Sequence, residues 1–206
     1  MKEIVIYLEG GGHIRETQAQ LRDGMNAFLG PVKGLADSKG WRWRLVALGG
    51  REQAFRRWSQ GVTTEPGALH VLLVDSEEEV TRSPCDHLRN RQGDGWTIAK
   101  ALEPQVHLMA QCMESWLTAD PDGLADYYGK YFERGRLPTR DNLEEEPKAV
   151  IYRALELATK KTQKGAYGKI NHAAALLALV DPAKTRGRCP HCERLFVTLE
   201  GKIEGA

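Results

Sequence analysis

Three acidic residues stand where a metal ion could be held. Glu9 directly follows one apolar run, and Asp75 and Glu77 directly follow another. In an open α/β sheet, ligands gather at the carboxyl ends of the strands, and residues two apart in an extended segment point the same way. Three carboxylates meeting there would repel one another unless a cation neutralised them. Because hard oxygen ligands suit Mg²⁺ or Mn²⁺, the sequence predicts a metal site formed by Glu9, Asp75 and Glu77.

A simpler interpretation stays open for each acid taken alone. Strands often end in polar residues, and Asp75-Ser76-Glu77 could simply cap the helix that follows. The two acidic sites together favour the metal, because Gly10–Gly12 directly follow Glu9. Glycines lack side-chain bulk and reach positive φ, so the backbone there can turn sharply or approach a ligand closely.

Four further residues are candidates for the same site. Glu114 begins a predicted helix just past a predicted strand, and an ordinary surface position is the alternative. Asp120 is either a second ligand or the start of a turn. Lys169 could offset phosphate charge near the metals, as could Lys148, and both could equally be exposed lysines. Tyr167 is not expected to share a helical face with Lys169, because residues two apart on a helix do not face each other.

The Cys-Pro-His-Cys run at 189–192 matches half of a zinc site or a redox motif. A structural zinc needs four ligands, and Cys85, Cys112 and the six histidines offer no second pair at suitable spacing. A redox motif is expected at a helix start after an early strand, whereas this one lies late in the chain. Zinc with help from His191 or His172 stays an alternative. His13, directly after the glycines, lies near the expected metals or simply begins a helix.

The elements that must position these residues alternate along the chain. Short apolar or alternating runs predict strands at 2–8, 41–48, 69–74 and 106–110. Helical spacing predicts helices at 14–29, 52–58 and 111–118. The segments 30–40 and 83–95 are rich in turn-forming residues and are expected as loops. This alternation favours an α/β fold with a mostly parallel, Rossmann-like sheet and helices on both faces.

After residue 137 the pattern becomes helical. Helices are expected at 147–160 and 166–180, with Pro182 ending the second. Residues 160–194 carry eight Lys or Arg against two acids, which is either a face that contacts phosphates or a solvated helical surface. We expect an α/β metal-binding core at 1–137 with a helical extension at 138–206 packed on it.

Composition sets the outer limits. A chain of 206 residues suits one medium domain, and a net charge of +1 gives no general attraction to nucleic acid or membrane. No apolar run approaches the ~20 residues that cross a bilayer. The first residues enter a strand-like run rather than a signal peptide, so a cytoplasmic location is expected.

The order of the acidic motifs resembles the Toprim domain, the metal-binding domain of topoisomerases, primases and overcoming-lysogenization-defect (OLD-type) nucleases. That family has a Glu and a glycine-containing turn after its first strand, and an Asp-x-Asp after its third. Glu9 with Gly10–Gly12 matches the first motif, and Asp75-Ser76-Glu77 matches the second. Glu77 replaces the final Asp, which lengthens one ligand arm by a methylene. The resemblance covers roughly 2–117.

The whole chain is still more similar to an uncharacterised bacterial Toprim-like family, whose members often lie beside genes for ABC-type or AAA-type ATPases. The matching segments are Tyr7–Gly12, Leu72–Glu77, His107–Asp120, Pro147-Lys148 and the Tyr167-x-Lys169 helix. These segments span most of the chain.

The resemblance implies a Mg²⁺- or Mn²⁺-dependent phosphodiesterase acting on nucleic acid, more on DNA than on RNA. Two ions ~4 Å apart would clamp the scissile phosphate. Asp75, Glu77 and Glu9 would hold the ions, Glu9 also serving as general base, while Glu114 completes the site and Lys169 faces the phosphate. An ATPase partner in bacterial defence or DNA repair and self-association are further expectations. The alternatives are a non-catalytic scaffold subunit of an ATPase complex and a metal-dependent nucleotidyl transferase.

Overall fold

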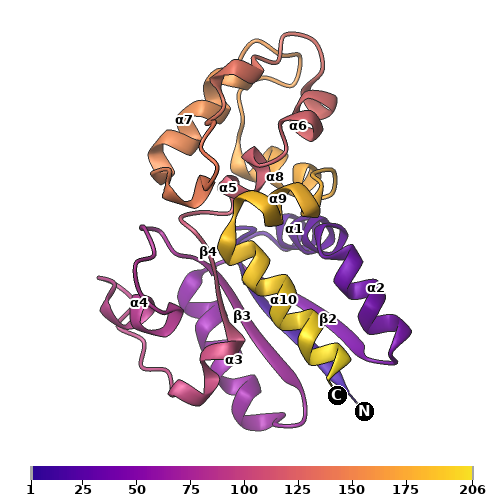
Figure 1. Cartoon of the computed structure of the whole chain (residues 1–206), viewed down its shortest axis with the longest axis vertical. Coiled ribbons are helices and arrows are strands. Elements are labelled where there is room, and N and C mark those ends of the chain that lie inside the picture. Colours follow the sequence, from indigo (N-terminus) through magenta and orange to yellow (C-terminus); the bar gives the residue numbers. More distant parts are fainter. Residues whose placement is uncertain (1, 206) are drawn as a thin grey trace.

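Four strands lie side by side in one parallel sheet (Figure 1). The computed structural model describes residues 2–205. The strands are β1 (Glu3–Glu9), β2 (Arg42–Leu48), β3 (Leu69–Asp75) and β4 (Val106–Met109). Their order is β2-β1-β3-β4, and each neighbouring pair is parallel. The predicted Rossmann-like α/β fold is confirmed, including the expected parallel pairing of the first and third strands.

The sheet is buried on both faces, because its central strands are apolar along nearly their whole length. Ile4, Ile6 and Leu8 of β1 belong to one apolar core, whereas Val5 and Tyr7 belong to another. Successive side chains of a strand point to opposite faces, so a continuous apolar run needs cover on both sides. This is why the run that opens the chain becomes a central strand.

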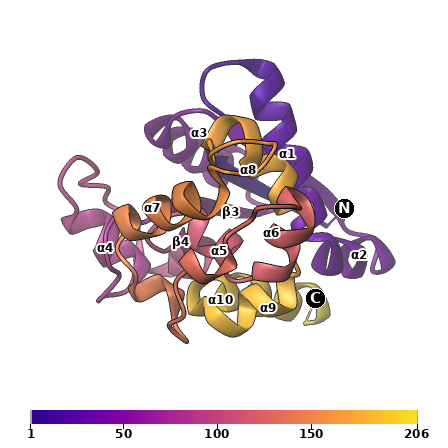
Figure 2. The same cartoon turned by 90° about the horizontal axis from the view of Figure 1, so that it is seen from above.

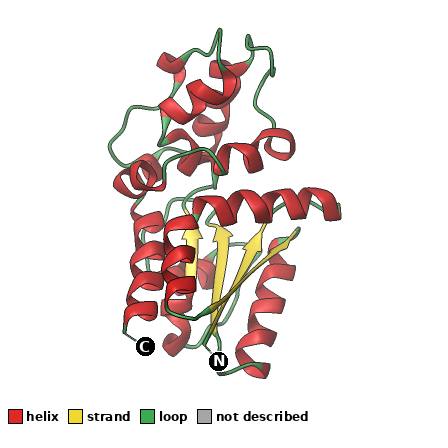
Figure 3. Cartoon of the chain, turned by 90° about the vertical axis from the view of Figure 1, so that its right-hand side faces the viewer, coloured by secondary structure: helices red, strands yellow, loops and turns green. Residues whose placement is uncertain are grey.

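Helices supply that cover. The helices that cover the sheet in the first core are α1 (Arg15–Phe28), α2 (Gly30–Ser38) and α10 (Pro190–Glu204), and this core continues into the later short helices of the chain. The helices of the second core are α3 (Arg51–Thr64) and α4 (Pro84–Asn90). Figure 3 shows the helices standing on either side of the strands.

A group of short helices covers the carboxyl ends of the strands (Figures 1 and 2). They are α5 (Glu114–Thr118), α6 (Pro121–Tyr128), α7 (Lys148–Thr159), α8 (Lys169–Leu177) and α9 (Pro182–Arg188). We call residues 114–188 the cap. Three 3₁₀ turns complete the chain, at Lys100–Gln105, Arg134–Arg136 and Leu143–Glu145.

Two of the expected loops contain helices. Most of 30–40 is helical, since Gly30–Ser38 form α2. Pro31 sits in its first turn, where a missing N–H costs nothing, and Val32 and Ala36 bury its inner face. Within 83–95, Ser83 caps α4 by accepting a hydrogen bond from the backbone N–H of Asp86. The prediction of a loop was wrong over Gly30–Ser38 and over Pro84–Asn90, because a proline in the first turn begins each of these helices.

Helix bounds in the second half of the chain also differ from those expected. The helix expected at 111–118 begins only at Glu114, and the one expected at 166–180 is α8 alone. Pro182 follows the C-terminal end of α8 but occupies the first turn of α9, so it starts a helix as well.

The last helix returns to the sheet. Leu195, Phe196 and Leu199 of α10 are buried in the first core. Arg194 of the same helix donates a hydrogen bond of 2.7 Å to the carbonyl oxygen of Val106, at the start of β4. The chain therefore ends beside the sheet rather than in the cap. Across residues 2–205, no helix is both long and apolar enough to cross a membrane.

Candidate functional site

The structure brings Glu9 and Asp75 together at the carboxyl edge of the sheet. They are the last residues of the adjacent parallel strands β1 and β3. Glu9 Oε2 accepts a hydrogen bond of 3.2 Å from the backbone N–H of Asp75. Two residues 66 positions apart in sequence thus meet because parallel strands place their carboxyl ends at one edge.

Burial disfavours the charged forms of both acids, and repulsion from a neighbouring acid adds to it, Asp75 acting on Glu9 and Glu114 acting on Asp75. Burial and the Asp75 carboxylate raise the pKa of Glu9 to about 7, against the opposing effect of Arg51. Burial also raises the pKa of Asp75, whose side chain is only 4% exposed, although Lys169 acts in the other direction. A cation placed between the two carboxylates would relieve this repulsion.

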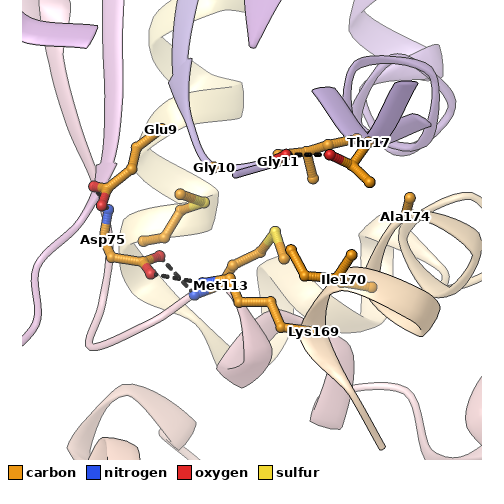
Figure 4. A pocket seen from close by; sticks show the side chains of 12 residues that line it. Glu9, Gly10, Gly11, Thr17, Asp75, Met113, Lys169, Ile170 and Ala174 are labelled. Atoms are coloured by element: carbon orange, nitrogen blue, oxygen red, sulfur yellow. Dashed lines mark hydrogen bonds and ion pairs between the residues drawn. The ribbon is translucent and has the colours of Figure 1, made fainter. Parts of the chain in front are cut away.

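Both oxygens of Asp75 already have protein partners (Figure 4). Oδ1 accepts a hydrogen bond of 2.9 Å from the backbone N–H of Met113, and Oδ2 lies 3.2 Å from the Nζ of Lys169. Lys169 is the first residue of α8, which aims its ammonium at the sheet edge. Burial alone would lower the pKa of Lys169, but Asp75 and Glu114 outweigh it and raise that pKa.

Glu114 is a second acid near the Lys169 ammonium and is completely buried. Its Oε1 accepts a hydrogen bond of 2.8 Å from the hydroxyl of Tyr167. Its Oε2 has no hydrogen-bond partner among residues 2–205 and lies 3.8 Å from Lys169 Nζ. Tyr167 and Lys169 do face the same group, contrary to expectation, because α8 begins only at Lys169 and Tyr167 lies outside the helix.

Glu77 does not join Glu9 and Asp75 but pairs with a lysine of the cap. Its backbone has a φ of 67°, so the chain has left the extended conformation, and the argument that Asp75 and Glu77 point the same way no longer applies. Glu77 Oε2 lies 2.6 Å from the Nζ of Lys148, the first residue of α7. Lys148 is therefore the partner of Glu77 rather than a free lysine.

Arg51 is a member of the site that the sequence analysis missed. Its Nη1 lies 3.0 Å from Glu9 Oε2 and also donates to the carbonyl oxygen of Asp75. Its Nε and Nη2 each lie 2.6 Å from an oxygen of Asp94, whose side chain is 1% exposed. A signal was present, since Gly49-Gly50-Arg51 follows β2 at the same edge of the sheet. Asp94 lies in a loop and carried no such signal.

A pocket opens beside these acids (Figure 4). Glu9, Asp75 and Lys169 line one end of it, and Gly10 and Gly11 form part of its rim. Gly10–Gly12 all have positive φ, which L-residues with side chains rarely adopt. The sequence indicated that this glycine turn can approach a ligand closely, and the pocket lies beside it.

The fit of these residues to a metal ion is partial. Glu9 and Asp75 supply hard oxygens from two strands, and Glu114 adds a buried oxygen without a hydrogen-bond partner. However, no group of three or more His, Cys, Asp or Glu within residues 2–205 stands in a metal-binding arrangement. The three-acid site predicted from Glu9, Asp75 and Glu77 is not assembled in this conformation, because Glu77 pairs with Lys148.

Asp120 does not belong to the site. It accepts a hydrogen bond of 3.0 Å from the backbone N–H of Asp181 and lies 2.7 Å from the Nζ of Lys184. These contacts hold the start of α9 to the start of α6, which is a structural role.

The cysteine pair at 189–192 is packed in the core. Cys189 and Cys192 are both fully buried, and burial raises the pKa of each thiol. Zinc binds the thiolate form, so this environment disfavours the zinc alternative. The Nδ1 of His191 lies 2.6 Å from Glu144, and His172 is hydrogen-bonded to the hydroxyl of Tyr128. His13 is exposed in the turn before α1.

Comparison with known proteins places the chain in a family. A family model described as "Domain of unknown function (DUF4276)" matches residues 8–200. The chain belongs to this family. No curated protein and no solved structure gives a significant match. The comparisons name no Toprim domain, so that resemblance stays a prediction.

Proposed function

We propose that this chain, as a member of the DUF4276 family, is a divalent-cation-dependent phosphodiesterase that acts on nucleic acid, DNA in preference to RNA. One observation carries the proposal. Glu9 and Asp75 converge from adjacent strands at one end of a pocket, and their proximity and burial raise the pKa of Glu9 to about 7. A perturbed acid pair in a cleft is a common sign of a functional site.

Glu9 and Asp75 are the residues that would hold Mg²⁺ or Mn²⁺. When bound, the ion would supply an activated water and neutralise charge on the scissile phosphate. Lys169 must then move away from Asp75. Oε2 of Glu114 has no hydrogen-bond partner among the described residues and lies 3.8 Å from Lys169 Nζ, so it can accept a hydrogen bond from the displaced ammonium. Glu77, paired with Lys148, would join only after a rearrangement.

The other side chains orient these groups. Arg51 holds Glu9 through its Nη1 and is itself fixed by Asp94, so it sets the direction of the Glu9 carboxylate. Tyr167 holds Oε1 of Glu114 and leaves Oε2 facing Lys169. The Lys169 ammonium lies at the pocket and would offset the negative charge of a phosphate oxygen.

A second candidate function is favoured by a different observation. Asp75, Glu77 and Glu9 each have a cationic partner, namely Lys169, Lys148 and Arg51. Two of these partners begin cap helices. The acids would then serve to fasten the cap to the sheet, as in a scaffold subunit. An ATPase partner and self-association belong to this alternative as much as to the first, and both stay predictions.

Glu9→Gln and Asp75→Asn test the proposal. Both changes keep the side-chain shape and remove one ligand charge. We expect Mn²⁺ affinity to fall by at least about 10–100-fold, which is the loss on changing a group that only orients a ligand. Mn²⁺-dependent cleavage of labelled DNA should be lost with it. Calorimetry measures the binding, gel electrophoresis the cleavage, and circular dichroism the retention of the fold.

Glu3→Gln is the matched control. Glu3 and Glu9 lie at opposite ends of β1, their side chains are 18% and 17% exposed, and each pairs with an arginine. Glu3→Gln should therefore leave binding and cleavage intact. If the parent protein binds no Mn²⁺, the metal proposal is wrong. Loss of stability in Asp75→Asn without any metal binding would then support the scaffold.

A further inference from the structure

The pocket beside the acids joins a charged end to an apolar wall. We propose that it holds an unpaired nucleobase, with the adjoining phosphate at Glu9, Asp75 and Lys169 (Figure 4). This inference rests on the proposed function, because it places the base next to the phosphate on which the acids would act. It adds a substrate class, which is single-stranded nucleic acid read without regard to sequence.

The apolar wall comes from three parts of the fold. It consists of Leu21 of α1, Met109 of β4, Met113 before α5, and Ile170, Ala173 and Ala174 of α8. Such a surface attracts the flat face of a base through dispersion and release of water. Methionine sulfur also makes favourable contacts with aromatic rings.

The pocket offers little that could identify one base. Among the described lining residues, Thr17 is the one side-chain hydroxyl, and it is hydrogen-bonded to the carbonyl oxygens of Gly11 and Ile14. Its proton is therefore engaged. Bases are distinguished by hydrogen bonds to their edges, whereas dispersion contact between an aliphatic wall and the flat face of a base does not depend on those edges. We infer that the four bases are accepted alike.

The position of the pocket requires an unpaired base. A base that leaves the stack to enter a side pocket loses its partner, and this costs least in a single strand or at a frayed end. Ile170 lines the pocket and is 51% exposed, so apolar surface is open to solvent there. A Cβ at Gly12 would lie 3.7 Å from Ile170 Cδ1, an ordinary van der Waals distance. Ile170 therefore lies against the glycine turn.

Ala174→Leu fills the pocket, and Ala175→Leu is its control. Ala174 is half-buried and lines the pocket, whereas Ala175 is the next residue of α8 and is exposed outside it. Ile170→Ala is a second variant, which removes apolar wall at an exposed position that the fold tolerates. The probes are dTMP, dAMP and deoxyribose 5-phosphate, which has the phosphate without a base. Calorimetry with Ca²⁺ and with chelator measures their binding.

We expect the parent protein and Ala175→Leu to bind dTMP and dAMP alike, and at least about tenfold more tightly than deoxyribose 5-phosphate. Ala174→Leu and Ile170→Ala should lose most of that difference, while binding of deoxyribose 5-phosphate stays unchanged. Equal binding of all three probes would overturn the inference and leave the metal proposal standing. Absence of any nucleotide binding would overturn it as well. Base-dependent binding that persists without metal, in a protein without cleavage, would support the pocket and refute the proposed function.

Discussion

Lys169 is the cation shared by two acids of the site. Its ammonium lies 3.2 Å from Asp75 Oδ2 and 3.8 Å from Glu114 Oε2, and both acids are buried. In a buried cluster of this kind, removing one partner leaves the others uncompensated, which costs more than the intact pair contributes. The lysine therefore both stabilises the apo site and competes with any cation that approaches Asp75.

Lys169→Met should destabilise the protein in chelator and strengthen metal binding. We expect a loss of about 2 kcal/mol, below the ~3–5 kcal/mol of a wholly buried pair, because the Lys169 side chain keeps 36% exposure. Removing the competing ammonium should raise Mn²⁺ affinity, so Mn²⁺ should raise the unfolding midpoint of the variant more than that of the parent. Urea titrations with and without Mn²⁺ measure both effects.

Lys148→Met serves as the comparison. Lys148 and Glu77 are each more than a quarter exposed, and ion pairs of such exposure contribute about 0–1 kcal/mol. A larger loss in Lys148→Met than in Lys169→Met would contradict the central position given to Lys169.

The raised pKa of Glu9 predicts a pH dependence of stability. Because this pKa is about 7 in the folded protein against 4.5 ordinarily, the folded state binds more protons than the unfolded state between those values. The free energy of unfolding should therefore fall as pH rises from about 4.5 to about 7, by up to about 3 kcal/mol from this group. Urea titrations from pH 4.5 to 8 in chelator measure it.

Glu9→Gln should flatten this profile, because the amide does not titrate. A variant profile as steep as that of the parent would assign the pH dependence to another group. Saturating Mn²⁺ should also flatten the parent profile if the ion holds Glu9 in its charged form.

At the scale of elements, the contact between α1 and α8 fixes where Lys169 lies. Gly24 of α1 packs directly on the backbone of Ala174, and a Cβ at Gly24 would lie 2.2 Å from the Ala174 carbonyl oxygen. Since Lys169 begins α8, a shift of this helix would draw the ammonium away from Asp75.

Gly24→Ala should destabilise the protein by about 1–2 kcal/mol, because overpacking a tight contact outweighs the gain of alanine in a helix. Gly34→Ala, in open space on α2, should stabilise by up to about 1 kcal/mol. Urea unfolding midpoints measure both. Equal stabilisation in the two variants would show that α1 and α8 are not packed this closely.

The sheet was predictable from the sequence because buried parallel strands are continuous apolar runs. All four strands form within two residues of their expected ends, and Glu9 and Asp75 meet as their strand positions required. The helices α2, α4 and α9 were less predictable, since Pro31, Pro84 and Pro182 begin helices as readily as they end them.

The polar partners were predictable only in part. Lys169 was a candidate by resemblance, but its pairing with Asp75 spans 94 residues and depends on how the cap folds back. Arg51 and Asp94 also meet across a long separation, 43 residues, because the loop after α4 lies against the start of α3. The position of Glu77 depended on one backbone angle, which no pattern in the sequence specifies for a non-glycine residue.

At the scale of the molecule, the two ends of the chain share one core. Helix α10 buries Leu195, Phe196 and Leu199 against the same apolar cluster as Ile4 and Ile6 of β1. The cap is thus an excursion between β4 and α10. It is anchored at both ends, because the segments before and after it, β4 and α10, are buried in the sheet layer.

The long sequence separations inside the site have a consequence for how the protein is made. Arg51 reaches back 42 residues to Glu9, Tyr167 reaches back 53 to Glu114, and Lys169 reaches back 94 to Asp75. A growing polypeptide therefore carries Asp75 and Glu114 long before their ammonium partner has been synthesised. Contacts of such range form late, after the entropy of closing the intervening loop has been overcome. The complete cluster of acids and lysine can form only after Lys169 has been synthesised. We therefore expect no activity of this site in a nascent chain that ends before Lys169.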